Sequence, residues 1–167
     1  ADFIVSRFSR LYPVYWFAII VTTIVVWSIG LKGEERSLYE TLANFTMLQG
    51  ILEIRDVDGV YWTLLYELIF YALMFMAYRL NLLKHICLLI GAGVSLNVLN
   101  SVIDIIPWKI QLFLLLEYNH LFGAGIVFFL LNKNGFKPEY GAVLLLCLFA
   151  QWAQVRDYSS YIVSGFF

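Results

Sequence analysis

Apolar residues along the chain gather in runs of about twenty, the length of a bilayer-spanning helix, separated by short polar stretches. These polar stretches hold most of the charged side chains. The pattern predicts an all-α, polytopic bundle of transmembrane helices with about five complete spans and the start of a sixth. The expected spans are 11–31, 60–78, 86–103, 110–131 and 140–155, with a partial span over 158–167.

The pattern continues over residues 1–167 without a repeat, a low-complexity tract or a soluble linker, so we expect a single transmembrane domain. The sequence starts at Ala1 in a basic amphipathic stretch and stops at Phe167 in an apolar run that has just begun. We therefore interpret it as a fragment, incomplete at both ends. The lack of a signal peptide is then uninformative.

The composition excludes an ordinary soluble fold. Of the 167 residues, 62% are hydrophobic and 14% are charged, against about a quarter charged in globular domains, and the mean hydropathy is +0.80. We expect the lipid bilayer as surroundings and no nucleic-acid partner, whereas the net charge of −1 says little by itself. Cys87 and Cys147 lie in apolar runs without CxxC spacing, so neither a disulfide nor a metal site is indicated.

The placement of basic residues predicts the orientation. Those before the first span, between the second and third, and between the fourth and fifth fall on one side if the helices alternate, and this side should be cytoplasmic. They are Arg7, Arg10, Arg79, Lys84, Lys133 and Lys137. The acid-rich loop 32–59 would then be extracytoplasmic, although Leu38, Leu42 and Leu52 recur there at helical intervals and could follow an interface.

Arg7 and Arg10 are spaced i, i+3, so they share a face if the first helix extends back to them. The planar guanidinium donates two parallel hydrogen bonds and suits a phosphate group. The alternative is that both are positive-inside anchors that reach lipid headgroups.

Glu67 is a carboxylate about two turns into the second span, where its charge is costly unless it faces the bundle interior or water. Thr63 and Tyr71 share its helical face, so Thr63 could orient the carboxylate and Tyr71 could stack beside it. Equally, Glu67 could pair with an Arg or Asn of a neighbouring helix and fix the packing.

Asp58 and Gly59 precede the second span as a turn, where Asp58 could satisfy free backbone N–H groups at the helix start. Tyr61 and Trp62 fit an aromatic belt at the membrane surface. The same interpretation applies at the other surface to Tyr12, Tyr15 and Trp16.

Glu117 and His120 are also spaced i, i+3 within the fourth span and could form a proton relay. They match half of a Glu-x-x-His di-iron pattern, but the second half is missing from the sequence, which makes a metal site improbable. Gly123 and Gly125 follow at once, so a close helix–helix contact is the simpler interpretation of this face.

Two motif regions stand out along the chain. The first, residues 6–13, is an Arg-x-x-Arg-hydrophobic-Tyr-Pro segment. The second is a loop, residues 44–48, followed over residues 57–71 by a Trp-Thr-Leu-x-x-Glu-x-x-Phe-Tyr helix. Together they resemble the membrane-bound acyltransferase-3 family, and residues 121–123 of a later span add a weaker likeness.

The resemblance implies a multi-helix enzyme, in the bacterial inner membrane, that moves an acyl group to a carbohydrate hydroxyl, as in exopolysaccharide or O-antigen modification. The donor would be acyl-CoA, usually acetyl-CoA, with no bound cofactor, and the acceptor a glycan or lipid-linked saccharide. The resemblance assigns acyl-CoA phosphates to Arg7 and Arg10 and a candidate catalytic role to Glu67. It places Asp58, Trp62, Thr63 and Tyr71 in the same region.

The family's catalytic His belongs to a helix N-terminal to the Arg-x-x-Arg segment, where this sequence has not yet begun. His85 and His120 do not occupy that motif. We expect the missing His to act as general base in the intact protein, so residues 1–167 alone should be inactive. The acyl group, the acceptor sugar and the oligomeric state stay open.

Two other classes of function fit the same residues. A proton-coupled transporter or flippase would also contain buried Glu67, Glu117 and His120, although the pattern shows no clear broken helix. In a structural membrane subunit, Glu67 and Asn97 would serve as interhelical hydrogen-bond partners.

Overall fold

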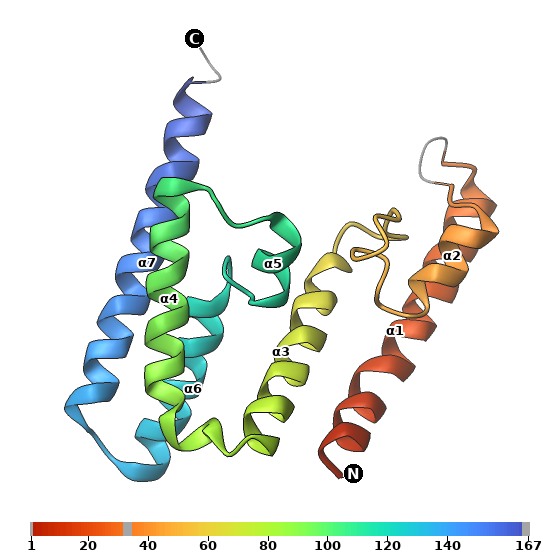
Figure 1. Ribbon diagram of the computed structural model, residues 1–167. Helices are drawn as coiled ribbons and strands as arrows, with labels where there is room; N and C mark the ends of the chain where they lie inside the picture. The colour runs from red at the N-terminus through yellow and green to blue at the C-terminus, as the bar shows by residue number, and fades with distance from the viewer. Residues whose placement is uncertain (1, 32–34, 165–167) are drawn as a thin grey trace. The chain divides into compact units, whose positions relative to one another are not determined.

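A computed structural model describes the backbone of residues 2–31 and 35–164 and the side chains of residues 5–31 and 35–155. Every regular element in these ranges is helical, which confirms the all-α class. The chain forms two compact units, residues 1–72 and 73–167. The expected single domain stays a prediction. The elements, drawn in Figure 1, are α1 (Asp2–Ile29), α2 (Leu38–Asn44), α3 (Trp62–Arg79), the 3₁₀ helix η1 (Leu82–His85), α4 (Ile86–Ile103), α5 (Trp108–Phe113), α6 (Asn119–Asn134) and α7 (Pro138–Ser164).

Two helical stretches in the described residues are long and apolar enough to cross a membrane, Val5–Ile29 and Leu82–Ile103. Only 11% of the most apolar window of the first and 22% of that of the second is buried, whereas the core helix of a soluble protein would be mostly buried. In α3, Glu67, Arg79 and several tyrosines lower the hydropathy. The expected bundle of five spans is therefore not confirmed.

The first unit is organised by α1. Both Arg7 and Arg10 lie within this helix, which therefore extends back to them from the expected span 11–31. Its buried face contributes Tyr15 and Ile19, which pack in a small apolar core with Met47 and Val57 of the segment that follows α2.

The segment between α1 and α3 is not a simple surface loop, because it folds back along α1. Three aromatic side chains of α1 donate hydrogen bonds to three consecutive backbone carbonyls at the end of α2. They are Tyr15 to Asn44 (2.7 Å), Trp16 to Phe45 (3.0 Å) and Tyr12 to Thr46 (3.2 Å). From Trp16 to Ile29 the helix rises about 20 Å. The segment after α1 therefore runs back beside the helix for about 20 Å. This distance is about two thirds of the 30 Å thickness of a bilayer's hydrocarbon core.

These hydrogen bonds give Tyr12, Tyr15 and Trp16 partners within the protein, while their expected place in an aromatic belt stays a prediction. The last carbonyls of a helix lack intrahelical partners, and the side chains of α1 supply such partners at the end of α2. Tyr61 also has a partner within this unit, since its ring packs edge-on against Tyr15 with centroids 5.1 Å apart.

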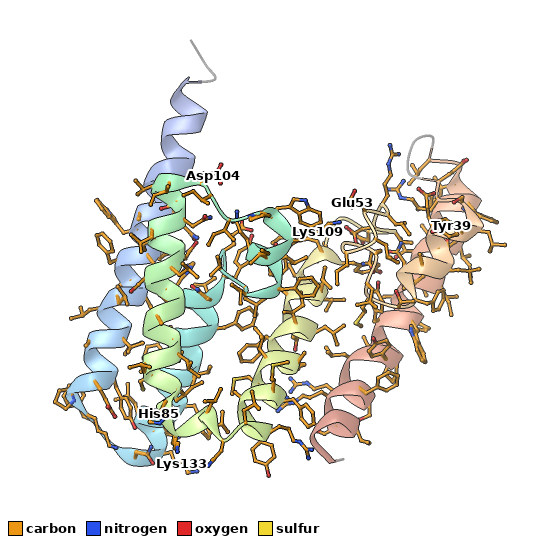
Figure 2. The ribbon with its side chains drawn as sticks, in the orientation of Figure 1. Tyr39, Glu53, His85, Asp104, Lys109 and Lys133 are labelled. Atoms are coloured by element: carbon orange, nitrogen blue, oxygen red, sulfur yellow. The ribbon has the colours of Figure 1, made fainter. Side chains whose placement is uncertain are left out.

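Helix α2 is amphipathic with its polar face inside. Thr41 and Asn44 are buried, while Leu38, Tyr39 and Leu42 are exposed; Figure 2 labels Tyr39 on this helix. An outward apolar face suits lipid rather than water. A capping box starts the helix: the Ser37 hydroxyl accepts from the Glu40 N–H (3.2 Å), and the Glu40 carboxylate accepts from the Ser37 N–H (2.8 Å). The extracytoplasmic location of residues 32–59 stays a prediction, and residues 32–34 lie outside the described part.

The second unit is a bundle in which α4, α6 and α7 pack on one another (Figure 1). Its core includes Ile90, Val94, Val127, Val143 and Cys147. Helices α4 and α6 approach closely at Gly123, where an added Cβ would overlap Cγ2 of Ile90. Figure 2 shows His85 and Lys133 at one end of this unit and Asp104 at the other, so the basic connections of the unit share an end.

Two predicted spans differ from the structure. The expected helix 110–131 is broken: α5 ends at Phe113, residues 114–118 form turns, and α6 begins at Asn119. Leu115 adopts a left-handed backbone with φ +52°, which an α-helix cannot contain. Conversely, α7 continues from Pro138 to Ser164, so the expected segments 140–155 and 158–167 join in one helix up to Ser164. Residues 165–167 lie outside the described part.

Candidate functional site

The first candidate site joins the two helices that carry the predicted motifs, within residues 1–72. The guanidinium carbon of Arg7 on α1 lies 5.1 Å from the centroid of the Tyr71 ring on α3, within the range of a cation–π contact. The Tyr71 hydroxyl donates to Oε1 of Glu67 at 2.5 Å. All three side chains are half-buried. A cation, a phenol and a carboxylate, all singled out from the sequence, therefore form one connected group.

This group differs in detail from the expectation. Tyr71 does not stack on the carboxylate but donates a hydrogen bond to it, which satisfies a charge that is expensive away from water. Thr63 does not orient Glu67, because its hydroxyl donates to the carbonyl of Val60 (3.0 Å) and its side chain is exposed. The hydroxyl bonds to the Val60 carbonyl rather than to Glu67 because this carbonyl lies three residues earlier on the same segment, within easy reach of the side chain.

Of the other predicted residues, Arg10 lies on α1 three positions after Arg7 and is exposed. The Asp58 carboxylate accepts from the Val60 N–H at 3.1 Å and so supports the turn that leads into α3, as expected of a capping residue. Trp62 is 43% exposed and packs edge-on against Tyr66. The binding roles of these residues stay predictions.

The sequence analysis placed Asn44 in a motif region but did not predict that this side chain holds the returning segment together. Its side chain is fully buried and makes three hydrogen bonds. The amide group donates to the carbonyls of Glu40 (2.8 Å) and Arg55 (2.9 Å), and its oxygen accepts from the Val57 N–H (3.0 Å). A buried Gln49 nearby donates to Oδ1 of Asp56 (2.8 Å). The burial of both residues has no sequence signal, because each lies in an acid-rich stretch that is typical of an exposed loop.

The second candidate site lies entirely within the second unit. A cavity of about 170 Å³ is lined by Glu117, Tyr118, His120, Leu121, Gln151, Gln154 and Val155. His120 is 1% exposed, and its Nε2 lies 2.9 Å from Oε1 of Gln151 on α7. The Gln154 amide donates to the backbone carbonyl of Glu117 (2.9 Å). The structure thus brings Glu117 and His120 to one cavity, although a turn and not a continuous helix places Glu117 there.

No family model matches the sequence, and no solved structure matches it. The chain is distantly similar to one protein whose name describes it as an acetyltransferase. It is 23% identical over 135 residues to a protein of Acidianus two-tailed virus called "Putative acetyltransferase ORF330". The match covers 79% of this chain and 40% of the viral protein, so the chain spans about two fifths of that relative's length. This likeness is consistent with acetyl transfer, and the acyltransferase-3 resemblance stays a prediction.

Proposed function

We propose that the chain belongs to a membrane-embedded acyltransferase that moves an acetyl group from acetyl-CoA to a carbohydrate hydroxyl. The contact of Arg7, Tyr71 and Glu67 carries the proposal, because it joins both motif regions in one place. The acetyltransferase relative supports the reaction type. The exposed apolar faces of Val5–Ile29 and Leu82–Ile103 support the membrane.

In this proposal Arg7 and Arg10 together bind the acetyl donor, acetyl-CoA. Arg10 is exposed and can meet a phosphate of acetyl-CoA with its planar fork. Arg7 is held over the Tyr71 ring, so its guanidinium is already oriented and loses little side-chain freedom when the donor binds.

Glu67 would act beside the transferred group as the active-site carboxylate. Its hydrogen bond from Tyr71 fixes the carboxylate on α3, and a fixed acceptor can orient a hydroxyl for attack. The resemblance assigns proton removal to a His that precedes Arg7 in the family. Bond formation between the acceptor oxygen and the acetyl carbon would release CoA as its thiol.

The test uses the full-length protein in membrane vesicles, with labelled acetyl-CoA and a lipid-linked saccharide. Arg10→Ala should raise KM for acetyl-CoA about ten- to a hundredfold, since a hydrogen bond to a charged group contributes about 1.5–3 kcal/mol. Glu67→Gln should lower kcat about a hundredfold or more. Arg79→Ala and Glu139→Gln remove the same groups from exposed positions at helix ends and should leave both constants unchanged.

Normal acylation in both Arg10→Ala and Glu67→Gln would contradict the site assignment. Glu67 could still pair helices as a structural element, and Tyr71→Phe separates the two roles. It keeps the ring under Arg7 but removes the hydroxyl that reaches Glu67. A purely structural Glu67 would give lower stability with unchanged kcat per folded molecule.

A proton-coupled carrier is the second candidate, and one observation favours it. The expected fourth span is broken at residues 114–118, next to Glu117 and His120, and broken helices line the substrate sites of many transporters. Proton-dependent uptake of a saccharide by the same vesicles, without acetyl transfer, would favour the carrier over the enzyme.

A further inference from the structure

The end of α2 lies against the middle of the candidate span in α1. This span, Val5–Ile29, has 25 residues, so its centre lies one residue after Trp16. Tyr15 and Trp16 donate hydrogen bonds to the carbonyls of Asn44 and Phe45 at the end of α2. In a bilayer crossed by α1, the end of α2 therefore lies near the middle of the hydrocarbon core.

The placement of charge in this segment matches that depth. Residues 41–52 contain no charged side chain, and Glu40 and Glu53 flank them. The uncharged stretch includes the end of α2 and the bend that follows it. Figure 2 shows Tyr39 and Glu53 toward the end of the first unit that lies away from the N-terminus of α1. The charged ends of the segment thus lie toward one membrane surface, and the uncharged bend lies deeper.

The irregular backbone between α2 and α3 is largely hydrogen-bonded within the protein. In hydrocarbon, non-helical backbone is tolerated only where its polar groups are satisfied in this way or face water. The N–H groups that donate to protein acceptors are those of residues 45–48, 51, 52, 54, 57, 60 and 61. A loop in water needs fewer such bonds, because water satisfies its exposed groups. The bonding of this segment therefore suits a location inside a bilayer.

The outward surface of residues 41–52 is mainly apolar. Thr41, Asn44 and Gln49 are buried, and the hydroxyl of the exposed Thr46 donates to the carbonyl of Ala43 (2.7 Å). The exposed apolar side chains are Leu42, Leu48 and Leu52. A segment at a water surface has the opposite arrangement, with apolar side chains inside and polar ones outside. The inverted arrangement suits contact with the acyl chains of lipids.

We propose that residues 35–61 form a re-entrant membrane element. It enters the bilayer beside the end of α1, bends near the middle of the hydrocarbon core at residues 44–49, and returns to the same side. Acyl chains of bilayer lipids cover its outward surface at Leu42 and Leu48. The inference rests on the membrane embedding of the proposed function and is independent of acetyl transfer.

Nitroxide labels on single cysteines measure this depth in the full-length protein, reconstituted in phosphatidylcholine vesicles. The background variant lacks the native cysteines, including Cys87 and Cys147. Labels at Leu42→Cys and Leu48→Cys should collide often with oxygen and rarely with a neutral nickel chelate. Their ratio of oxygen to nickel collisions should exceed that of Glu53→Cys about tenfold or more, because hydrocarbon excludes the polar chelate. All three positions are exposed, so the labels should leave the fold intact.

A label at Phe17→Cys separates this inference from the membrane embedding itself. Phe17 lies at the centre of the candidate span and is 69% exposed. Equally high ratios at Phe17 and at Leu42 would support the re-entrant element. A high ratio at Phe17, with as many nickel collisions at Leu42 and Leu48 as at Glu53, would overturn the inference and leave the embedding intact.

Two other outcomes would also overturn the inference. Few collisions with either reagent at both Leu42 and Leu48 would mean that protein, and not lipid, covers the outward surface. Frequent nickel collisions at Phe17 would contradict the membrane embedding, and the re-entrant element would fail with it.

Discussion

Asn44 gives the sharpest test of the folded-back segment between α1 and α3. The Asn44→Ala variant removes three hydrogen bonds and leaves two partners outside the helices, the Arg55 carbonyl and the Val57 N–H, without the side chain that binds them. Each bond contributes about 1 kcal/mol net, and more where the partner stays buried and unsatisfied. We therefore expect the free energy of unfolding to fall by about 3 kcal/mol or more.

For a chain of this length, 1 kcal/mol corresponds to about 2–4 °C in Tm, so Asn44→Ala should unfold about 6–12 °C earlier. Hydrogen exchange measured by mass spectrometry locates the effect. Peptides that contain Val57 should lose protection, because the Asn44 side chain accepts from that N–H, while peptides of α4 should keep theirs. Asn132→Ala makes the same chemical change at an exposed position of α6 and serves as the control.

Equal Tm values for Asn44→Ala and Asn132→Ala, together with unchanged exchange at Val57, would refute the reasoning. In that case the segment would not be held by its polar interior. Asn44→Asp refines the result, since it keeps the acceptor for Val57 but removes both donated bonds.

Two further predictions concern helix packing and capping. Gly123→Ala should lower Tm by several degrees because the new methyl group meets the β-branched Ile90, whereas Gly125→Ala, with open space around it, should be neutral or stabilising; equal Tm values would contradict the close α4–α6 contact. In the capping box, hydrogen bonds from the Ser37 N–H and hydroxyl lower the pKa of Glu40. This stabilisation should be complete above about pH 5 and be lost as the pH falls below about 4. A pH series of Tm for Glu40→Ala should lack that step, and an unchanged step would assign it to another group.

The long apolar helices could be predicted from the sequence, but the break at residues 114–118 could not. The predicted span 86–103 coincides with α4 because His85 and Asp104 flank a mostly apolar run without a charged residue. The break before α6 falls in another apolar run and is made by Leu115 in a left-handed conformation. Residues 114–118 contain no Gly, Asn or Pro, and tertiary packing of the buried Leu115 and Leu116 stabilises the break instead.

The residues of the first unit also fall into those that the sequence analysis predicted and those that it did not. Arg7 could be singled out by its i, i+3 spacing with Arg10, Glu67 as a carboxylate within an expected span, and Tyr71 by its position on the same helical face as Glu67. Arg7 and Tyr71 meet because both lie in the unit formed by residues 1–72. The sequence analysis left out the capping box, although Ser37 and Glu40 form its Ser-x-x-Glu pattern. What could not be read was the polar interior of residues 37–60, because the partners of Asn44 are backbone atoms, which every residue possesses.

The three aromatic hydrogen bonds between α1 and the end of α2 also bear on how the protein is made. They join residues 29 to 34 positions apart, and short chain segments close in microseconds or less. Ribosomes add about 5–20 residues per second, so the returning segment has seconds to settle on α1 before α4 is synthesised. The second unit would then be added to a first unit that is already assembled, and the order of synthesis would itself protect the polar interior around Asn44 from mispairing.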